Sequence, residues 1–153
     1  MGYLELCVIA EELGRAIAPV PYSSSVYLAT TAILNCADEE LKKEYLPKLA
    51  SGEIIGTFAH AESSGFPLEK SINCKYTAGK ISGSKAAVPD ADIADFVIVS
   101  AKNESGVGLY LIDLNTDKIK ISSLDTFDPS RSHANLDISE ADAKELVSDG
   151  WLE

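Results

Sequence analysis

The sequence predicts an α+β fold in which short N-terminal helices precede an antiparallel β-barrel or β-sandwich. In the first third of the chain, apolar residues recur at spacings of three and four, which is typical of amphipathic helices. From residue 54 the pattern changes to short runs rich in β-branched and aromatic residues, separated by turn sequences. The two patterns are segregated along the chain and do not alternate, as expected of an α+β protein.

The first two predicted helices are separated by a proline-containing link. Helix one spans residues 3–17 and ends before Pro19 and Pro21, because proline cannot continue a helix. Helix two begins at the serines of positions 23–25 and runs to about Cys36. We expect the serine hydroxyls to cap the first free amides of this helix.

A third helix is predicted to begin at Asp38. Three acidic residues in succession, 38–40, suit the positive end of the helix dipole, and Pro47 falls near the predicted end. The three helices are short and apolar for their length. We therefore expect them to pack against a larger helical body.

The remainder of the chain reads as short strands. Residues 118–121 alternate between lysine and isoleucine, as a half-buried antiparallel strand does. A short helix is expected from Ser139, with Asp142 as its capping partner, and Trp151 is expected to be a packing residue for another domain. The predicted strands cover residues 54–61, 72–77, 80–88, 96–101, 108–114, 119–123 and 134–138.

Composition excludes several classes of function. The net charge of −11, from 24 acidic and 13 basic residues, would repel nucleic acid and anionic membranes. Cys7, Cys36 and Cys74 form no CxxC or Cys/His cluster, so neither a metal site nor a disulfide framework is supported. Apolar stretches are too short for a membrane span and no signal-peptide pattern is present, so we interpret the protein as cytoplasmic.

Five sequence blocks follow one another along the chain: EELGR at 11–15, YLPKLASGE at 45–53, GTFAHAE at 56–62, ISGSK at 81–85 and ADIADF at 91–96. The third block follows the second almost at once, and this pairing is the most specific feature. On these blocks, in this order, the chain resembles the acyl-CoA dehydrogenase family along nearly its whole length. The stretch at 125–131 is similar to the D-x-T-R turn of divergent members, some of which act on bulky acyl-CoA substrates such as steroid side chains.

The resemblance implies a three-part architecture. Residues 1–52 correspond to the end of the N-terminal helical domain, and residues 53–139 to the middle β-barrel domain. Residues 140–153 correspond to a segment leading to a C-terminal helical bundle. We therefore expect a fragment of a longer enzyme, monomeric or weakly associated by itself, with an exposed apolar strip along residues 3–17.

The resemblance also implies a reaction, the α,β-dehydrogenation of an acyl-CoA thioester with FAD as hydride acceptor. Partners of the parent enzyme would be the acyl-CoA substrate and an electron-transfer acceptor, within a homo- or hetero-tetramer. The catalytic base of the family usually comes from the C-terminal bundle. No catalytic residue is therefore assigned to this chain, which is expected to be inactive alone.

The family's flavin contacts map onto one strand and its following turn, and onto one later segment. Backbone N–H groups in such a strand and turn can bind flavin carbonyls and phosphates. The small residues of the turn permit close approach of a ligand. The cofactor-binding residues implied by the resemblance are Phe58, His60, Ala61, Ser63, Ser64, Val88 and Pro89.

Two of these positions depart from the family pattern. Typical members carry Thr or Ser where this chain has Ala61, and Trp, a further residue and then Ser or Thr where it has residues 87–89. Pro89 offers neither a hydroxyl nor a backbone N–H. An alternative is therefore a partner subunit or scaffold of the same fold that does not hold the flavin.

Other polar residues have simpler interpretations. Glu62 is interpreted as a structural acid that accepts from nearby backbone amides, and His60 as a hydrogen-bonded, non-catalytic histidine. Arg131 is expected to pair with Asp125 or Asp128 in its own turn, with a contact to a CoA phosphate as the alternative.

Overall fold

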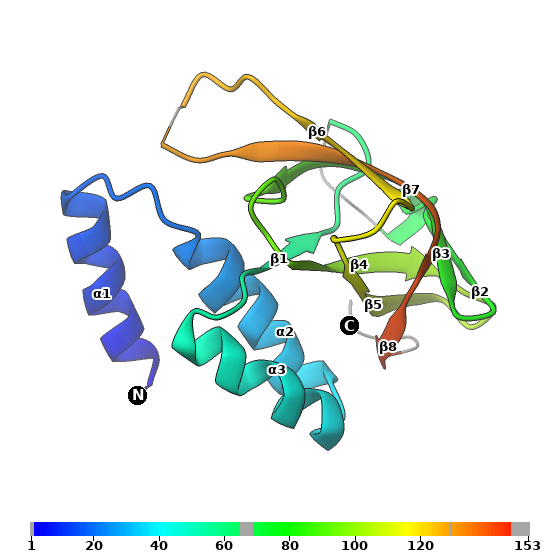
Figure 1. The fold of residues 1–153 in the computed structure, drawn as a ribbon, viewed down its shortest axis with the longest axis horizontal. Helices are drawn as coiled ribbons and strands as arrows, with labels where there is room; N and C mark the ends of the chain where they lie inside the picture. Colours follow the sequence, from blue (N-terminus) through cyan, green and yellow to red (C-terminus); the bar gives the residue numbers. More distant parts are fainter. Residues whose placement is uncertain (1, 65–68, 129, 148–153) are drawn as a thin grey trace.

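The computed structural model describes residues 2–64, 69–128 and 130–147. In Figure 1 the helices lie together at one side of the molecule, with α1 outermost, and the sheet lies at the other side. The predicted α+β class is confirmed. The helical elements are α1 Tyr3–Arg15, the π-helical η1 Ser23–Thr30, its direct continuation α2 Thr31–Cys36, α3 Glu39–Ser51 and the short 3₁₀ turn η2 Glu69–Ser71.

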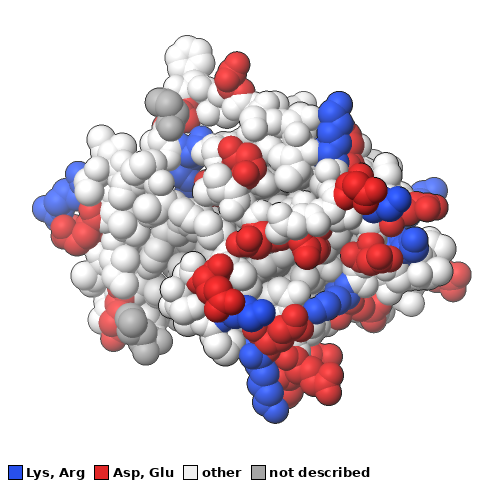
Figure 2. Space-filling view, in the orientation of Figure 1, with Lys and Arg blue, Asp and Glu red and all other residues white. Residues whose placement is uncertain are grey.

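Helix α1 packs loosely on the rest of the chain. None of its residues is buried, and Tyr3, Leu4 and Val8 are 73%, 76% and 56% exposed, so the expected apolar strip is present. Figure 2 shows a surface with few charged side chains between α1 and the body of the molecule. The hydroxyls of Tyr22 and Tyr27 both donate to the carbonyl of Leu6, at 2.9 and 3.1 Å, and these contacts attach α1 to η1.

The expected capping role of the serines at 23–25 is wrong. No side chain caps η1, whose N-cap residue is Tyr22. Ser24 instead donates to the buried carboxylate of Asp90, and Ser25 accepts from the amide of Gly56 at 3.4 Å. A buried carboxylate without hydrogen-bond donors costs free energy, which explains why Ser24 bonds to Asp90.

Helix α3 begins as predicted and ends later than predicted. The side chain of Asp38 accepts from the amide of Leu41 at 2.8 Å, which confirms the N-cap. The helix continues past Pro47 and ends at Ser51, where Gly52 has a φ of +74°. Glycine adopts this left-handed conformation without strain, and so it terminates the helix.

Eight strands form one mostly antiparallel sheet with the order β6-β7-β3-β2-β4-β5-β8, and β1 lies beside β4. The strands β1 and β2 pair with β4 in parallel, and the other pairs are antiparallel. The strands are β1 Gly56–Ala59, β2 Lys75–Thr77, β3 Lys80–Pro89, β4 Phe96–Lys102, β5 Val107–Asp113, β6 Ile119–Ser123, β7 His133–Asp142 and β8 Lys144–Val147.

The helix predicted from Ser139 is wrong, because β7 continues to Asp142 and β8 follows it. Ala141 is 1% exposed and belongs to the sheet core, and β8 pairs with β5. Burial of these apolar side chains outweighs the local capping pattern. Trp151 lies outside the described residues.

The sheet has an apolar core on each face. One core lies on the face of the sheet that is turned away from the helices and includes Val97, Val99 and Leu136. The other lies between the sheet and the helices and includes Ile33 and Ile98. Strand β4 contributes alternate residues to both cores, so it is buried on both faces and forms the centre of the molecule.

Two findings concern possible membrane and metal binding. Among the described residues, no helix is both long and apolar enough to cross a membrane. Within the same part of the chain, no three His, Cys, Asp or Glu side chains come close enough to hold a metal ion.

Helix and sheet approach each other closely at Gly56. A Cβ at this position would lie 2.4 Å from Cζ of Phe96 and 2.7 Å from Cβ of Ala29. We expect Gly56→Ala to lower the free energy of unfolding by about 1–3 kcal/mol through overpacking, measured by urea denaturation. Gly14→Ala in α1 is the control, since nothing lies within 4 Å of its added Cβ. This control should be neutral or stabilising by about 0.5–1 kcal/mol. Equal effects of the two substitutions would contradict the close packing.

Candidate functional site

A groove lies where the end of β1 meets the end of β3. Its cavity volume is about 190 Å³. Phe58, His60 and Ala61 from the first predicted contact segment line it together with Val88 and Pro89 from the second. Ser63 and Ser64 lie outside this lining and are exposed. The groove is completed by Ala59, Ala86 and Ala87.

Two hydrogen bonds hold the walls of the groove together. The hydroxyl of Thr57 donates to the carbonyl of Pro89 at 2.5 Å, and the amide of Ala86 donates to the carbonyl of Ala61 at 2.8 Å. The side chain of Thr57 is buried, so water does not compete for this bond. These bonds bring residues more than twenty positions apart in sequence into one surface.

A β-bulge shapes one wall. The register between β3 and β7 shifts between Lys85 and Val88, and Ala87 has a φ of +49°. The amide of Ala87 donates to the side-chain oxygen of Asn135 at 3.0 Å, which holds the bulge. Val88 then returns to the sheet core and is 1% exposed. Bulges bend a strand and occur often beside functional sites, and here the exposed positions carry only methyl groups.

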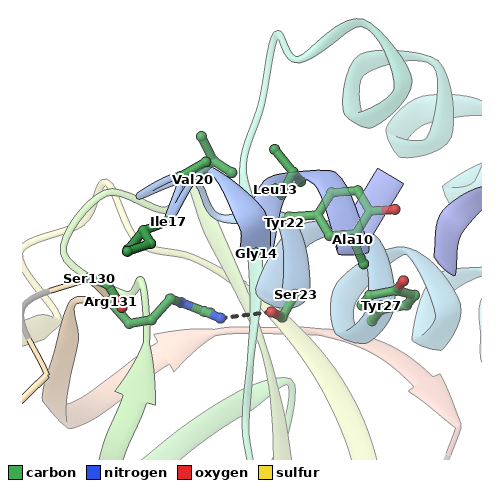
Figure 3. Close-up of a pocket in the computed structure, with 11 residues that line it drawn as sticks. Ala10, Leu13, Gly14, Ile17, Val20, Tyr22, Ser23, Tyr27, Ser130 and Arg131 are labelled. Atoms are coloured by element: carbon green, nitrogen blue, oxygen red, sulfur yellow. Dashed lines mark hydrogen bonds between the residues drawn. The ribbon is translucent and has the colours of Figure 1, made fainter. Parts of the chain in front are cut away.

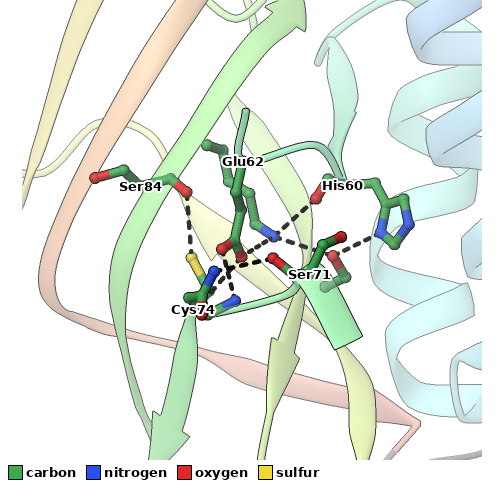
Figure 4. Close-up of polar contacts among 8 residues, drawn as sticks. His60, Glu62, Ser71, Cys74 and Ser84 are labelled. Atoms are coloured by element: carbon green, nitrogen blue, oxygen red, sulfur yellow. Dashed lines mark hydrogen bonds and ion pairs between the residues drawn. The ribbon is translucent and has the colours of Figure 1, made fainter. Parts of the chain in front are cut away.

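A buried ammonium group bonds to the backbone of the groove residue His60. Figure 4 shows the polar contacts around His60 and Glu62. The side chain of Lys85 is 0% exposed. Its Nζ donates to Oε1 of Glu62 at 2.8 Å, to the carbonyl of His60 at 3.0 Å and to the hydroxyl of Ser100 at 3.1 Å. An ammonium has three N–H donors, so each one has an acceptor.

Glu62 is a structural acid, as the sequence predicted. Besides Lys85, it accepts from the amides of Asn73 at 2.6 Å and Cys74 at 2.9 Å. Burial opposes its ionisation, but the bonds from Lys85 and from the two amides together outweigh burial and hold the pKa of Glu62 below its usual value. Since its lone pairs are committed, Glu62 is a poor candidate for a proton acceptor from a ligand.

His60 connects this network to the groove. Its Nδ1 lies 2.8 Å from the hydroxyl of Ser100, which agrees with the interpretation as a hydrogen-bonded histidine.

Burial raises the pKa of the neighbouring Cys74 thiol to about 12, so this cysteine is a packing residue and not a nucleophile.

A second polar cluster lies around Asp90. Nη2 of Arg131 donates to Asp90 at 3.0 Å and Nη1 donates to the hydroxyl of Ser23 at 2.7 Å. The expected pairing of Arg131 with Asp125 or Asp128 is therefore wrong. Asp90 is 4% exposed and needs a counter-charge, whereas the side chains of the turn are open to water.

Arg131 also lies at one end of a pocket between α1 and η1 (Figure 3). The cavity volume is about 300 Å³, and Leu13, Ile17 and Val20 are among its apolar lining residues. This pocket can hold a small apolar group beside the guanidinium of Arg131, whose charge is partly neutralised by Asp90. No local sequence pattern indicates this pocket, because it arises from the packing of two separate helices and a distant loop.

Comparisons with known proteins agree on one family. A family model described as the acyl-CoA dehydrogenase N-terminal domain matches residues 1–53. Mitochondrial isovaleryl-CoA dehydrogenase of Solanum tuberosum is 30% identical over 114 residues, covering 71% of this chain and 28% of that protein. Acyl-CoA dehydrogenase FadE27 of Mycobacterium tuberculosis is 28% identical over 149 residues, covering 95% of this chain and 39% of that protein.

Solved structures show the same fold. The ChsE4-ChsE5 complex from Mycobacterium tuberculosis has a TM-score of 0.83 at 24% identity, covering 96% of this chain and 41% of that chain. A glutaryl-coenzyme A dehydrogenase bound to glutaryl-CoA has a TM-score of 0.75 at 25% identity, covering 86% and 36%. The chain thus spans less than half the length of the relatives and structures that it matches.

Removing the counter-charge of Lys85 should destabilise the protein strongly. We expect Glu62→Gln to lower the free energy of unfolding by about 3–5 kcal/mol, because a buried ammonium is left without its carboxylate. Glu44→Gln is the control, since Glu44 and Lys144 form a surface pair at 3.1 Å with side chains 48% and 49% exposed. This control should cost less than about 1 kcal/mol. Urea denaturation at pH 7 measures both, and similar losses would contradict the buried pair.

The same carboxylate predicts a pH dependence. The pKa of Glu62 is lowered in the folded state from 4.5, so its stabilising contribution is fully present above about pH 4.5. This contribution is lost as the pH falls through the lower, folded-state value. Wild type should therefore lose more stability than Glu62→Gln between pH 5 and pH 3, measured by denaturation at each pH. Parallel profiles would show that Glu62 does not titrate differently on folding.

Proposed function

This chain belongs to the acyl-CoA dehydrogenase family, and we propose that it supplies one wall of an FAD site in a longer acyl-CoA dehydrogenase. The observation that carries the proposal is the groove at the ends of β1 and β3. Both segments to which the family resemblance assigns flavin contacts meet there, joined by the bond between Ala86 and Ala61.

The groove suits one face of a planar ring system. The methyl groups of Ala61, Ala86 and Ala87 leave the backbone accessible, and Phe58 and Pro89 add apolar surface. A space of about 190 Å³ holds only part of such a cofactor, so the opposite wall must come from elsewhere.

We propose that the reaction of the longer protein is α,β-dehydrogenation of an acyl-CoA thioester, with an electron-transfer acceptor as the final partner. FAD, when bound, supplies the hydride-accepting chemistry. The residues of this chain orient the ring and exclude water from one side. Glu62 is occupied by Lys85 and by two amides, so the base that removes the α-proton would come from outside the described residues.

The second candidate is a subunit that does not itself hold FAD. It is favoured by Ala61 and Pro89, which provide no hydroxyl for the flavin. The similarity in fold to one chain of a complex between two differently named proteins, ChsE4 and ChsE5, is compatible with such a role. In this case the protein would act within a hetero-tetramer as the partner of a flavin-bearing subunit.

Restoring the missing hydroxyl tests the proposed cofactor site. We expect Ala61→Thr to tighten FAD binding about fivefold, because one added hydrogen bond contributes about 1 kcal/mol. Ala61→Val is the matched control, with the same shape and no hydroxyl, and should not tighten binding. Fluorescence quenching of FAD by the purified chain measures all three affinities.

Two outcomes of this titration would count against the proposal. Equal affinities of the Thr and Val variants would place the ring elsewhere. Absence of FAD binding by wild type and both variants, with binding regained in a co-purified partner, would support the second candidate.

A further inference from the structure

We propose that the pocket between α1 and η1 binds a small neutral molecule with an aliphatic body and one hydrogen-bond acceptor oxygen. Among the described residues, this pocket and the groove at the ends of β1 and β3 share no lining position. The inference is therefore independent of the proposed function. The lining comes from the second half of α1, the link after it, η1 and the loop before β7.

The backbone of Ile17, in the lining of the pocket, is strained. At the end of α1 the amide of Ile17 donates to the carbonyl of Gly14 at 3.1 Å. The next amide, that of Ala18, donates to the carbonyl of Leu13 at 2.9 Å. This is a Schellman ending, in which the residue at the position of Ile17 takes a positive φ and is usually glycine. Ile17 has a φ of +49°, an unfavourable conformation for a β-branched residue.

Burial does not offset this strain. Ile17 is 73% exposed and Val20 is 41% exposed, and both line the pocket. An isoleucine that remains largely in water gains little from the hydrophobic effect, so its presence at a glycine position needs another reason. Strained residues are concentrated at functional sites. The aliphatic body of a bound molecule would cover both side chains and supplies that reason.

The pocket has room for such a molecule. The α1 side of the lining includes small residues, and a Cβ added at Gly14 would meet nothing within 4 Å. The cavity volume is about 300 Å³. Since a water molecule occupies about 30 Å³ in the liquid, this space suits a molecule of about ten non-hydrogen atoms.

The charges at the polar end of the pocket favour a neutral molecule. Nη2 of Arg131 lies 3.0 Å from the carboxylate of Asp90. The carboxylate of Asp128 also interacts electrostatically with Arg131. A bound anion would compete with these two carboxylates for one guanidinium, in a protein whose net charge is −11.

Ser23 supplies the hydrogen-bond donor. Its hydroxyl oxygen accepts from Nη1 of Arg131 at 2.7 Å, as Figure 3 shows, so its own proton points away from the guanidinium. The hydroxyls of Tyr22 and Tyr27 do not serve, because both donate to the carbonyl of Leu6. The O–H of Ser23 is therefore placed to bind a carbonyl oxygen at this end of the pocket.

The proposed ligand class is tested with 2-octanone, and octanoate is its charged counterpart. In ¹H–¹⁵N correlation spectra of the purified chain at pH 7.5, 2-octanone should shift the amide signals of residues 13–18 and 22–27 saturably. Octanoate should bind about tenfold more weakly, because of the carboxylates near Arg131. Absence of saturable shifts in these segments, or equal or tighter binding of octanoate, would overturn the proposal.

Replacing Ile17 distinguishes a ligand site from a purely structural helix end. We expect Ile17→Gly to raise the midpoint of thermal unfolding by about 2 °C, since glycine adopts a positive φ without steric cost. The same change should weaken 2-octanone binding about fivefold, because an apolar contact is lost. Leu34→Ala is the control, since Leu34 is 51% exposed on α2 outside the lining, and it should leave the affinity unchanged. A lowered midpoint or an unchanged affinity in Ile17→Gly would refute the inference.

The donor is tested with a pair of variants at one position. Ser23→Ala should weaken 2-octanone binding about fivefold, the effect of one lost hydrogen bond. Ser23→Thr keeps the hydroxyl and should bind within about twofold of wild type. Equal affinities of these two variants would show that Ser23 is not the donor. Far-ultraviolet circular dichroism establishes that each variant is folded.

Discussion

The buried ammonium of Lys85 is the constraint around which this part of the molecule is organised. A charge with no exposed surface requires a counter-charge and an acceptor for each proton. These come from the end of β1, from Glu62 and from Ser100 of β4, while Glu62 also binds the amides that precede β2. Removing any one partner would leave a buried polar group unsatisfied, so the network specifies how these strands meet.

The position of the groove follows from this network. Strand β1 is short and lies parallel to β4, and η1 packs against Gly56 at its beginning. At its other end, the carbonyl of Ala61 is bonded to β3 where the bulge begins. The chain leaves β1 with its backbone held on both sides. The backbone of the surface between the strands is therefore hydrogen-bonded to its neighbours, and its exposed side chains are small.

Asp90 has the corresponding role between the helices and the sheet. Its carboxylate accepts from Ser24 of η1 and from Arg131, which also donates to Ser23. The backbone of Asp90 has a φ of +53°, a left-handed conformation that aspartate adopts more readily than most residues. The hydrogen bonds from Ser24 and Arg131 attach the helical segment to the edge of the β3–β4 turn.

The sequence by itself determined the segregation of helices and strands, the Asp38 cap, the structural part played by Glu62 and the two segments that line the groove. Periodicity, the Asp38 cap and the family motifs all depend on residues that are close together in the sequence. Only the tertiary structure decided the partner of Arg131, the fate of the 23–25 serines and the strand at Ser139. In each case a group distant in sequence was buried, and the free energy of satisfying or covering it exceeded the local preference. His60 belongs to both classes, because its place after β1 was local while the partner of its Nδ1 is Ser100, forty residues away.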